Sequence, residues 1–268
     1  MLYKIIIIYL LYIYIINKYF MVLAVVNRKG GVGKTTNTIH IGAGLAAQGK
    51  KVLMIDMDPQ CDLTFGTGIR ESTYNVEDFL EQKGNLKLRQ KAMGFFVLSG
   101  SPDFIASRYD RNVLKEAIEP MKEHFDYIMI DTPPATINAM ELTPAEIALV
   151  ACDYFLIPIE AKAYPVKNAN SFLGSVFDHV ELHNPDLKFL GFFFTNVLVT
   201  RKGITKYRDM LTKGASDLLF KSFIRADVKI EEAVEKGLTI FQHKPHSRAG
   251  QDYSRLIEEL LEKIRSYE

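Results

Sequence analysis

The chain has 268 residues, enough for one large α/β domain. Its 33 Lys and Arg nearly balance its 32 Asp and Glu, and 48% of its residues are hydrophobic. This composition excludes both a long disordered chain and a histone-like polycation. The two cysteines, Cys61 and Cys152, lie far apart and lack CxxC spacing. Their placement excludes a disulfide scaffold and a cysteine zinc site, and it is typical of a reducing compartment.

The first 20 residues differ in composition from the rest of the chain. They include seven Ile, five Tyr and three Leu, but no Gly, Ala, Pro, Arg or acidic residue. The uncharged run between Lys4 and Lys18 has 13 residues, fewer than the roughly 20 that a transmembrane helix needs. No small-residue cleavage site follows it. We expect Met21 to be the true start and residues 1–20 to lie outside the fold, with a membrane-associating tail as the alternative.

Short apolar runs rich in β-branched residues alternate with helical stretches from residue 21 onward. The sequence predicts strands at Val22–Asn27, Val52–Asp56, Phe95–Ser99, Tyr127–Asp131, Tyr154–Pro158 and Phe189–Asn196. It predicts helices at Lys34–Gln48, Asn112–Glu123, Ala145–Ala151, Val166–Leu182, Ile204–Leu219 and Gln251–Ser266. Such strands are typical of a parallel sheet buried on both faces, with right-handed helical crossovers. We therefore predict a doubly wound, mostly parallel α/β fold in a single domain over residues 21–268.

A glycine-rich loop, RKGGVGKTT at residues 28–36, follows the first predicted strand and opens an amphipathic helix. Glycines let successive N–H groups point at phosphate oxygens, and the helix N-terminus adds its positive end. Lys34 can reach the β- and γ-phosphates of a nucleotide, and the Thr35 hydroxyl can bind Mg²⁺. The ordinary GxxxxGK[ST] motif needs glycine where this chain has Arg28, so the loop is a variant with an additional lysine. The predicted nucleotide-binding residues are Lys29, Gly30, Gly31, Val32, Gly33, Lys34, Thr35 and Thr36.

KGGVGKTT resembles the deviant Walker A loop of the ParA/MinD family of P-loop ATPases, and Lys29 matches the signature lysine of that family. The resemblance implies that ATP and Mg²⁺ are cofactors and that ATP holds a homodimer together. It also implies that Lys29 contacts phosphates held by the other subunit. Weaker similarity extends over most of residues 21–268, including the short segment Tyr74–Leu80, which looks like a helix after the first switch.

Two aspartates end predicted strands. Asp56 begins DMDPQ, which resembles a family segment whose first aspartate positions or activates the attacking water. An aspartate at this spacing could instead hold a dinucleotide ribose, but the form of the glycine loop argues against that. Asp131 begins DTPP, which is similar to the Walker B segment of the family, and would bind Mg²⁺ opposite Thr35. After PQ the family usually has glycine and a small polar residue, whereas this chain has Cys61 and Asp62, so the fine geometry of this switch stays open.

Residues 201–229 form a local basic segment, with eight Lys or Arg against three Asp, a balance of +5. In a ParA-type protein this segment would bind nonspecific double-stranded DNA, because no sequence-reading motif is present, and the binding would weaken steeply with salt. The alternative is an ordinary solvated helix face. The candidate DNA contacts are Arg201, Lys202, Lys206, Arg208, Lys221 and Arg225.

Asn196 ends the sixth predicted strand, where members of the family contact adenine, so we expect it to contact the adenine of ATP.

The predicted C-terminal helix helps to decide whether the chain binds DNA or a membrane surface. Its apolar stripe runs from Leu256 to Ile264, and its other face mixes three glutamates with Lys263 and Arg265, which an anionic membrane would not favour. We expect it to pack on the core. The resemblance therefore implies a slow, cytoplasmic, nucleoid-associated ParA-type partition ATPase that a ParB-like centromere-binding protein stimulates. The alternatives are a MinD-like membrane switch and a metabolic P-loop ligase, and Lys29 argues against the ligase.

Overall fold

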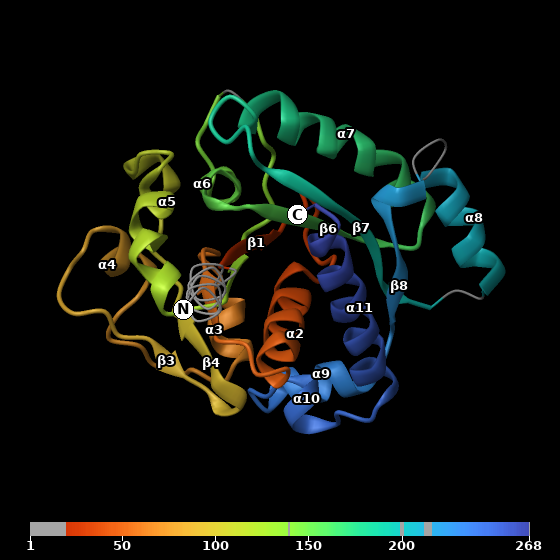
Figure 1. Cartoon of the computed structure of the whole chain (residues 1–268), viewed down its shortest axis with the longest axis horizontal. Coiled ribbons are helices and arrows are strands. Elements are labelled where there is room, and N and C mark those ends of the chain that lie inside the picture. The colour runs from red at the N-terminus through yellow and green to blue at the C-terminus, as the bar shows by residue number, and fades with distance from the viewer. Residues whose placement is uncertain (1–19, 139, 199–200, 212–215, 268) are drawn as a thin grey trace, which may run out of the picture.

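A computed structural model describes residues 20–138, 140–198, 201–211 and 216–267, so the predicted N-terminal extension lies outside the described residues apart from residue 20. Within this part the strands are β1 Met21–Val25, β2 Val52–Asp56, β3 Arg89–Gln90, β4 Phe95–Leu98, β5 Tyr127–Asp131, β6 Tyr154–Glu160, β7 Lys188–Val197 and β8 Leu219–Arg225. They form one sheet in the order β3-β4-β2-β5-β1-β6-β7-β8, and every pairing except β3–β4 is parallel. The predicted doubly wound fold is confirmed (Figure 1).

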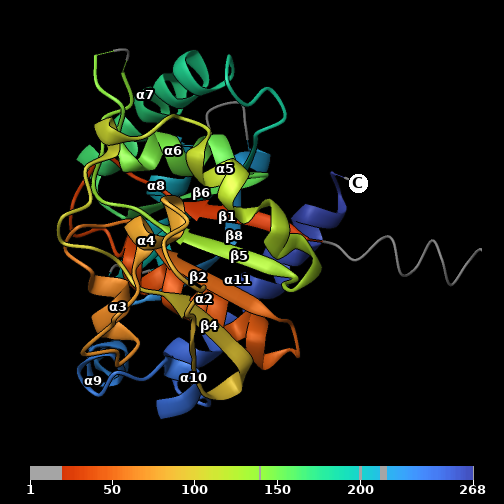
Figure 2. The same ribbon diagram turned by 90° about the vertical axis from the view of Figure 1, so that its left-hand side faces the viewer.

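Helices cover both faces of the sheet (Figures 1 and 2). On one face lie α2 Lys34–Ala47, α10 Ile240–His243 and α11 Arg248–Arg265; on the other lie α5 Val113–Ile118, α6 Pro144–Ala151 and α7 Ala163–Val180. The remaining α-helices are α3 Asp62–Gly66, α4 Val76–Leu80, α8 Arg201–Leu211 and α9 Val228–Glu235. Short 3₁₀ helices span Ala92–Gly94, Ala106–Arg108, Glu119–Glu123 and Ser216–Leu218. No helix within the described ranges is both long and apolar enough to cross a membrane.

The central strand β1 explains why its sequence lacks polar alternation. Its side chains point alternately to the two faces, and both faces are covered by helices. Val22 and Ala24 join the core under α5, α6 and α7, whereas Leu23 and Val25 join the core under α2 and α11. All of β1 is buried, so its far end is a rigid base for the loop that follows.

Helix α11 packs on the core, as predicted. Leu256, Ile257, Leu260 and Ile264 are buried, and they contact the sheet face that α2 also covers. The glutamates between them lie on the outer side, where Glu259 accepts hydrogen bonds from two backbone N–H groups of β8. This helix is therefore an integral part of the domain.

One predicted element is wrong. The sequence pattern favours a helix over Ile204–Leu219, but the described helix α8 ends at Leu211 and residues 219–225 form strand β8. Lys221 and Arg225 interrupt the apolar pattern of this segment. Charged residues are tolerated there because β8 is the last strand of the sheet, with one edge unpaired.

The other differences are at element boundaries and in short helices that were not predicted. The predicted helix Asn112–Glu123 divides into α5 and a 3₁₀ turn at Pro120, whose ring cannot donate the next helical hydrogen bond. Helix α7 begins at Ala163, three residues before its predicted start, and ends at Val180. Helices α3, α9 and α10 were not predicted, whereas α4 confirms the expected short helix in Tyr74–Leu80.

Candidate nucleotide-binding site

The glycine loop joins the carboxyl end of β1 to the N-terminus of α2. Gly31 and Gly33 have φ values of 71° and 79°, in the left-handed region where a Cβ atom is disfavoured. Gly33 is the N-cap of α2, and no side chain caps this helix. The first N–H groups of α2 therefore face the loop, an arrangement that favours an anion such as phosphate.

Lys34 lies inside this loop and is 6% exposed. Its ammonium makes a long contact of 3.4 Å with the carbonyl oxygen of Lys29. Burial lowers the pKa of Lys34, and the nearby carboxylates of Asp131 and Asp58 partly offset this effect. The side chain is thus a desolvated cation at the mouth of an anion site.

The register of the sheet brings the two predicted aspartates together. Asp56 and Asp131 are paired across β2 and β5, next to the end of β1, and both are fully buried. Burial, reinforced by the charge of Asp56, raises the pKa of Asp131 well above its ordinary value. A hydrogen bond with Thr35 and the charge of Lys34 act in the opposite direction. The site is therefore an acidic cluster that a bound cation would stabilise.

Asp131 and Thr35 have the chemistry that a magnesium ion needs. The Oδ2 atom of Asp131 is buried without a hydrogen-bond partner, and the Thr38 hydroxyl lies 3.4 Å from its Oδ1 atom. Mg²⁺ is usually held by one or two carboxylates together with substrate phosphates. The orphaned carboxylate oxygen beside the Thr35 hydroxyl fits such an ion, which would neutralise charge on the phosphates.

Asp56 is held by contacts that sequence reasoning missed. Its Oδ2 atom accepts hydrogen bonds from the Thr64 backbone at 2.9 Å and the Thr64 hydroxyl at 2.6 Å, while Asp58 N–H donates to Oδ1. Burial raises the pKa of Asp56 to about 6, although these hydrogen bonds lower it. A Cβ atom at Gly100 would lie 2.9 Å from the Asp56 carboxyl carbon. The glycine after β4 was the available signal for this close approach.

Cys61 occupies the position after PQ where the family usually has glycine, and it keeps a backbone conformation that glycine favours. It has a φ of 56°, the left-handed region that favours glycine, and it is the N-cap of α3. Burial, with the charge of Asp56, raises the pKa of the Cys61 thiol to about 12. Burial also raises the pKa of Cys152 well above its ordinary value. Both thiols are therefore protonated at neutral pH.

Neither cysteine should react with iodoacetamide in the native protein near pH 8, because the thiolate is the reactive form and both side chains are buried. Mass spectrometry should find both unmodified after a treatment that labels them fully in denaturant. Rapid labelling of Cys61 alone would contradict the buried, acid-flanked position that we describe.

Comparison with known proteins agrees with this geometry. A family described as an AAA domain matches residues 20–189. The chromosome-partitioning ATPase Soj of Thermus thermophilus is 30% identical, covering 90% of this chain and 96% of its own length. The sporulation initiation inhibitor protein Soj of Bacillus subtilis is 33% identical, covering 89% and 97%. This chain belongs to the Soj/ParA family of P-loop ATPases.

Solved structures of several activities share the Soj/ParA fold. An ATP complex of a McdA variant from Cyanothece has a TM-score of 0.76 at 24% identity, covering 92% of this chain and 97% of that one. MinD of Pyrococcus horikoshii with Mg-ADP has a TM-score of 0.75 at 23% identity, covering 92% and 98%. Cobyrinic acid a,c-diamide synthase of Mycobacterium smegmatis, with an ATP analogue and magnesium, has a TM-score of 0.73 at 27% identity, covering 92% and 97%. The fold alone therefore does not select one cellular role.

Two further candidate residues of this Soj/ParA chain are Lys29, within the loop, and Asn196, near the end of β7. The Lys29 ammonium is 2.7 Å from the Glu160 carboxylate, at the end of the neighbouring strand β6. Asn196 is exposed near the end of β7 with a φ of 51°. Its neighbour Thr195 accepts a 3.2 Å hydrogen bond from Asn37, which also donates to the carbonyl of Gly33. The end of β7 thus adjoins the glycine loop, while the adenine contact by Asn196 remains a prediction.

The structure gathers part of the predicted basic segment into one cleft of about 880 Å³ between α8, β8 and α11. Its basic lining side chains are Arg208, Lys221, Arg225, Arg248 and Arg255. The last two come from α11 and were missed, because both lie beyond the basic segment 201–229 in the sequence. Lys206 is exposed on α8, whereas the side chains of Arg201 and Lys202 lie outside the described part.

Several arginines of the cleft have carboxylate partners: Arg255 lies 3.5 Å from Asp252 and Arg248 lies 3.9 Å from Asp227, but the pair that Arg225 forms is shorter. The Nε atom of Arg225 donates to the Oδ2 atom of Asp252 at 2.8 Å, and its Nη2 atom lies 2.5 Å from the Oδ1 atom. This bidentate pair joins β8 to α11 and raises the pKa of Arg225. DNA contact by Arg225 remains a prediction, and the pair with Asp252 gives the residue a structural role.

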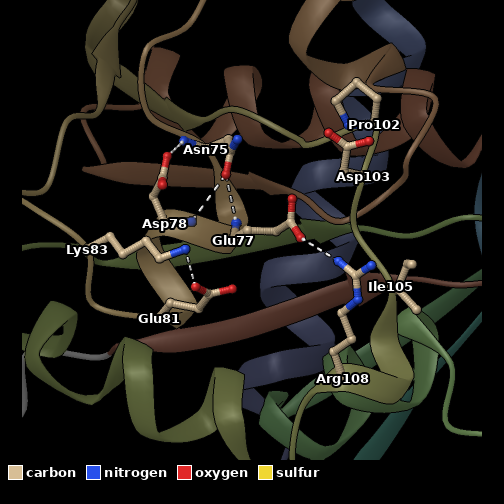
Figure 3. A pocket seen from close by; sticks show the side chains of 9 residues that line it. All are labelled: Asn75, Glu77, Asp78, Glu81, Lys83, Pro102, Asp103, Ile105 and Arg108. Atoms are coloured by element: carbon tan, nitrogen blue, oxygen red, sulfur yellow. Dashed lines mark hydrogen bonds and ion pairs between the residues drawn. The ribbon is translucent and has the colours of Figure 1, made fainter.

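A separate cavity of about 580 Å³ lies beside α4 (Figure 3). The Asn75 side chain caps α4 by accepting hydrogen bonds from the N–H groups of Glu77 and Asp78. Arg108 lies 4.0 Å from Glu77, and Lys83 pairs with Glu81. The charged groups of this cavity therefore pair largely with one another around a short helix.

Proposed function

We propose that this chain is a ParA-type partition ATPase, a switch that dimerises with ATP, grips nonspecific double-stranded DNA and releases it after hydrolysis. The proposal rests first on the candidate nucleotide site, where Lys34, Thr35 and Asp131 would surround MgATP. Both Soj relatives described above support it, and one is named as a chromosome-partitioning ATPase. A ParB-like centromere-binding partner would accelerate hydrolysis, and the chain would work on the nucleoid.

The observation that favours DNA is the basic cleft. Five Lys or Arg side chains line it against the single carboxylate of Asp252, in a chain whose total charge is only +1. A concentration of positive charge on a neutral protein is the electrostatic footprint of phosphate binding. The basic segment carries no sequence-reading motif, so the contacts would be with the DNA backbone and would tolerate any sequence.

Hydrolysis would proceed by in-line attack of water on the γ-phosphate. Lys34 would neutralise charge on the transferred group, and Asp56, whose orientation Thr64 holds, would position the water. Mg²⁺, held through Thr35 and Asp131, would neutralise the charge that develops on the phosphates. Lys29 of one subunit would reach the phosphates bound by its partner.

DNA binding should require ATP, be lost in Lys29→Ala and fall steeply with salt. Fluorescence anisotropy of a labelled duplex, with ATP or ADP at several salt concentrations, measures all three. Each lost phosphate contact lowers the log–log salt slope by about 0.9, so Lys221→Ala/Arg255→Ala should lower it by about 2 per protomer and weaken binding at least about tenfold.

The matched control is Lys50→Ala/Lys87→Ala, which removes two exposed lysines outside the cleft. Lys87 lies close in sequence to β3, at the edge of the sheet opposite β8. It should leave both the affinity and the salt slope unchanged. Equal loss in the two double variants would show a diffuse charge effect and contradict a binding cleft. Binding to anionic vesicles without DNA binding would instead favour the MinD-like membrane switch.

A further inference from the structure

Lys29 is held within its own subunit by one carboxylate. Its ammonium lies 2.7 Å from the Oε2 atom of Glu160, and Lys162 lies 2.8 Å from the Oε1 atom of the same residue. Hydrogen bonds from Lys162 and then Lys29 lower the pKa of Glu160, so the carboxylate is ionised at neutral pH. Glu160 therefore divides its two oxygens between two competing lysines.

The backbone around this triad is anchored, but the Lys29 side chain is half exposed. Asn27 ties the base of the loop to β6, because its side chain donates to the carbonyl of Pro158 and accepts from the Lys29 N–H. The Glu160 side chain is 10% exposed, whereas that of Lys29 is 53% exposed. The movable member of the pair is therefore the lysine side chain, which also borders a cavity of about 460 Å³ that gives it room to move.

We propose that Glu160 is a positioning residue that holds Lys29 on its own subunit until the phosphates of a second, nucleotide-loaded subunit compete for it. This inference rests on the proposed function, in which Lys29 crosses the dimer interface. One ammonium cannot satisfy Glu160 and a phosphate across the interface at full strength, so the ion pair must weaken or break when the dimer forms. Lys162 weakens the hold by sharing the carboxylate. Glu160 thus sets the concentration at which ATP drives dimerisation.

Glu160→Gln tests this, because glutamine keeps the size of the side chain and removes the charge. Self-association of the full chain with Mg²⁺ and a non-hydrolysable ATP analogue would be measured by analytical ultracentrifugation. An exposed ion pair changes an equilibrium by about two- to fivefold, and two such pairs break per dimer, so half-association should occur at about four- to twenty-five-fold lower protein concentration. Lys162→Gln should shift it in the opposite direction, since Glu160 would then hold Lys29 alone.

Glu119→Gln is the matched control, because Glu119 forms a 2.7 Å pair with Lys122 away from the loop. It should leave association unchanged. Affinity of the monomer for the ATP analogue, measured below the association range, should be the same in Glu160→Gln and the natural chain, whereas a distorted loop would weaken it. If Lys29→Ala no longer associates but Glu160→Gln associates no more strongly than the natural chain, the role of Glu160 is overturned and the dimer switch is not. Association that persists in Lys29→Ala would overturn the dimer switch itself.

Discussion

Lys34→Ala should weaken binding of MgATP by about two to three orders of magnitude. The Lys34 side chain is nearly buried, and its ammonium makes a long contact with the carbonyl oxygen of Lys29. Phosphate oxygens would replace that contact with two or three charge-assisted hydrogen bonds, each contributing about 1.5–3 kcal/mol. Because about 1.4 kcal/mol corresponds to a tenfold change, the loss of two such bonds accounts for the expected effect.

Lys50→Ala is the control for Lys34→Ala, since Lys50 is exposed just beyond the opposite end of α2. Titration of each variant with a fluorescent ATP analogue and Mg²⁺ gives the dissociation constants, and circular dichroism verifies the fold. Affinity of Lys34→Ala within about threefold of the natural chain would mean that the loop binds phosphate through its N–H groups alone.

The nucleotide site could be predicted because its elements are local in sequence. The glycine loop, with its following lysine and threonine, is one contiguous segment. Its conformation has left-handed backbone positions, and glycine is the residue that adopts them most readily. Asp56 and Asp131 were recognisable as the last residues of apolar strands. The parallel register of β2 and β5 then places them side by side.

The missed features depend on contacts between distant segments. Thr64 and Gly100 surround Asp56 only because α3 and the end of β4 converge there, 36 residues apart. Glu160 meets Lys29 across 131 residues. The basic cleft is similar, since Arg248 and Arg255 join it only through the packing of α11 on β8, and β8 itself was mistaken for the continuation of a helix. Charge counts along the chain locate a basic segment but not the surface on which its members meet.

Asp131→Asn should raise the stability of the nucleotide-free protein while removing most of its ATP hydrolysis. In the natural chain Asp131 is fully buried beside Asp56 and Asp58, and one of its oxygens has no hydrogen-bond partner. Asparagine is nearly isosteric and removes a desolvated charge from among like charges. We expect the melting temperature without nucleotide to rise by about 2–5 °C. Hydrolysis should fall by about two to three orders of magnitude, because an amide is a poor ligand for Mg²⁺.

The pH dependence of the melting temperature distinguishes removal of the buried charge of Asp131 from a general improvement in packing. Burial raises the pKa of Asp131 above its ordinary value of 3.8, so the unfolded chain loses this proton at lower pH than the folded protein. The contribution of Asp131 to the stability of the natural chain therefore falls as the pH rises above 3.8, and Asp131→Asn lacks this contribution. The difference in melting temperature between Asp131→Asn and the natural chain should therefore grow as the pH is raised from acid toward neutrality. Comparing the two proteins also cancels the opposing contribution of buried His40, whose pKa is lowered to about 3.

Magnesium nucleotide should reverse the order of stability. A cation at the orphaned oxygen of Asp131 offsets the repulsion that destabilises the empty site, so Mg²⁺ with an ATP analogue should raise the melting temperature of the natural chain much more than that of Asp131→Asn. Asp186→Asn, which removes an exposed charge, should follow the natural chain under every condition. Equal stabilisation of Asp131→Asn and the natural chain by the magnesium nucleotide would place the ion elsewhere. Lower stability of the empty variant would show that the charge of Asp131 is compensated within the folded protein itself, so the acidic cluster would not depend on a bound cation.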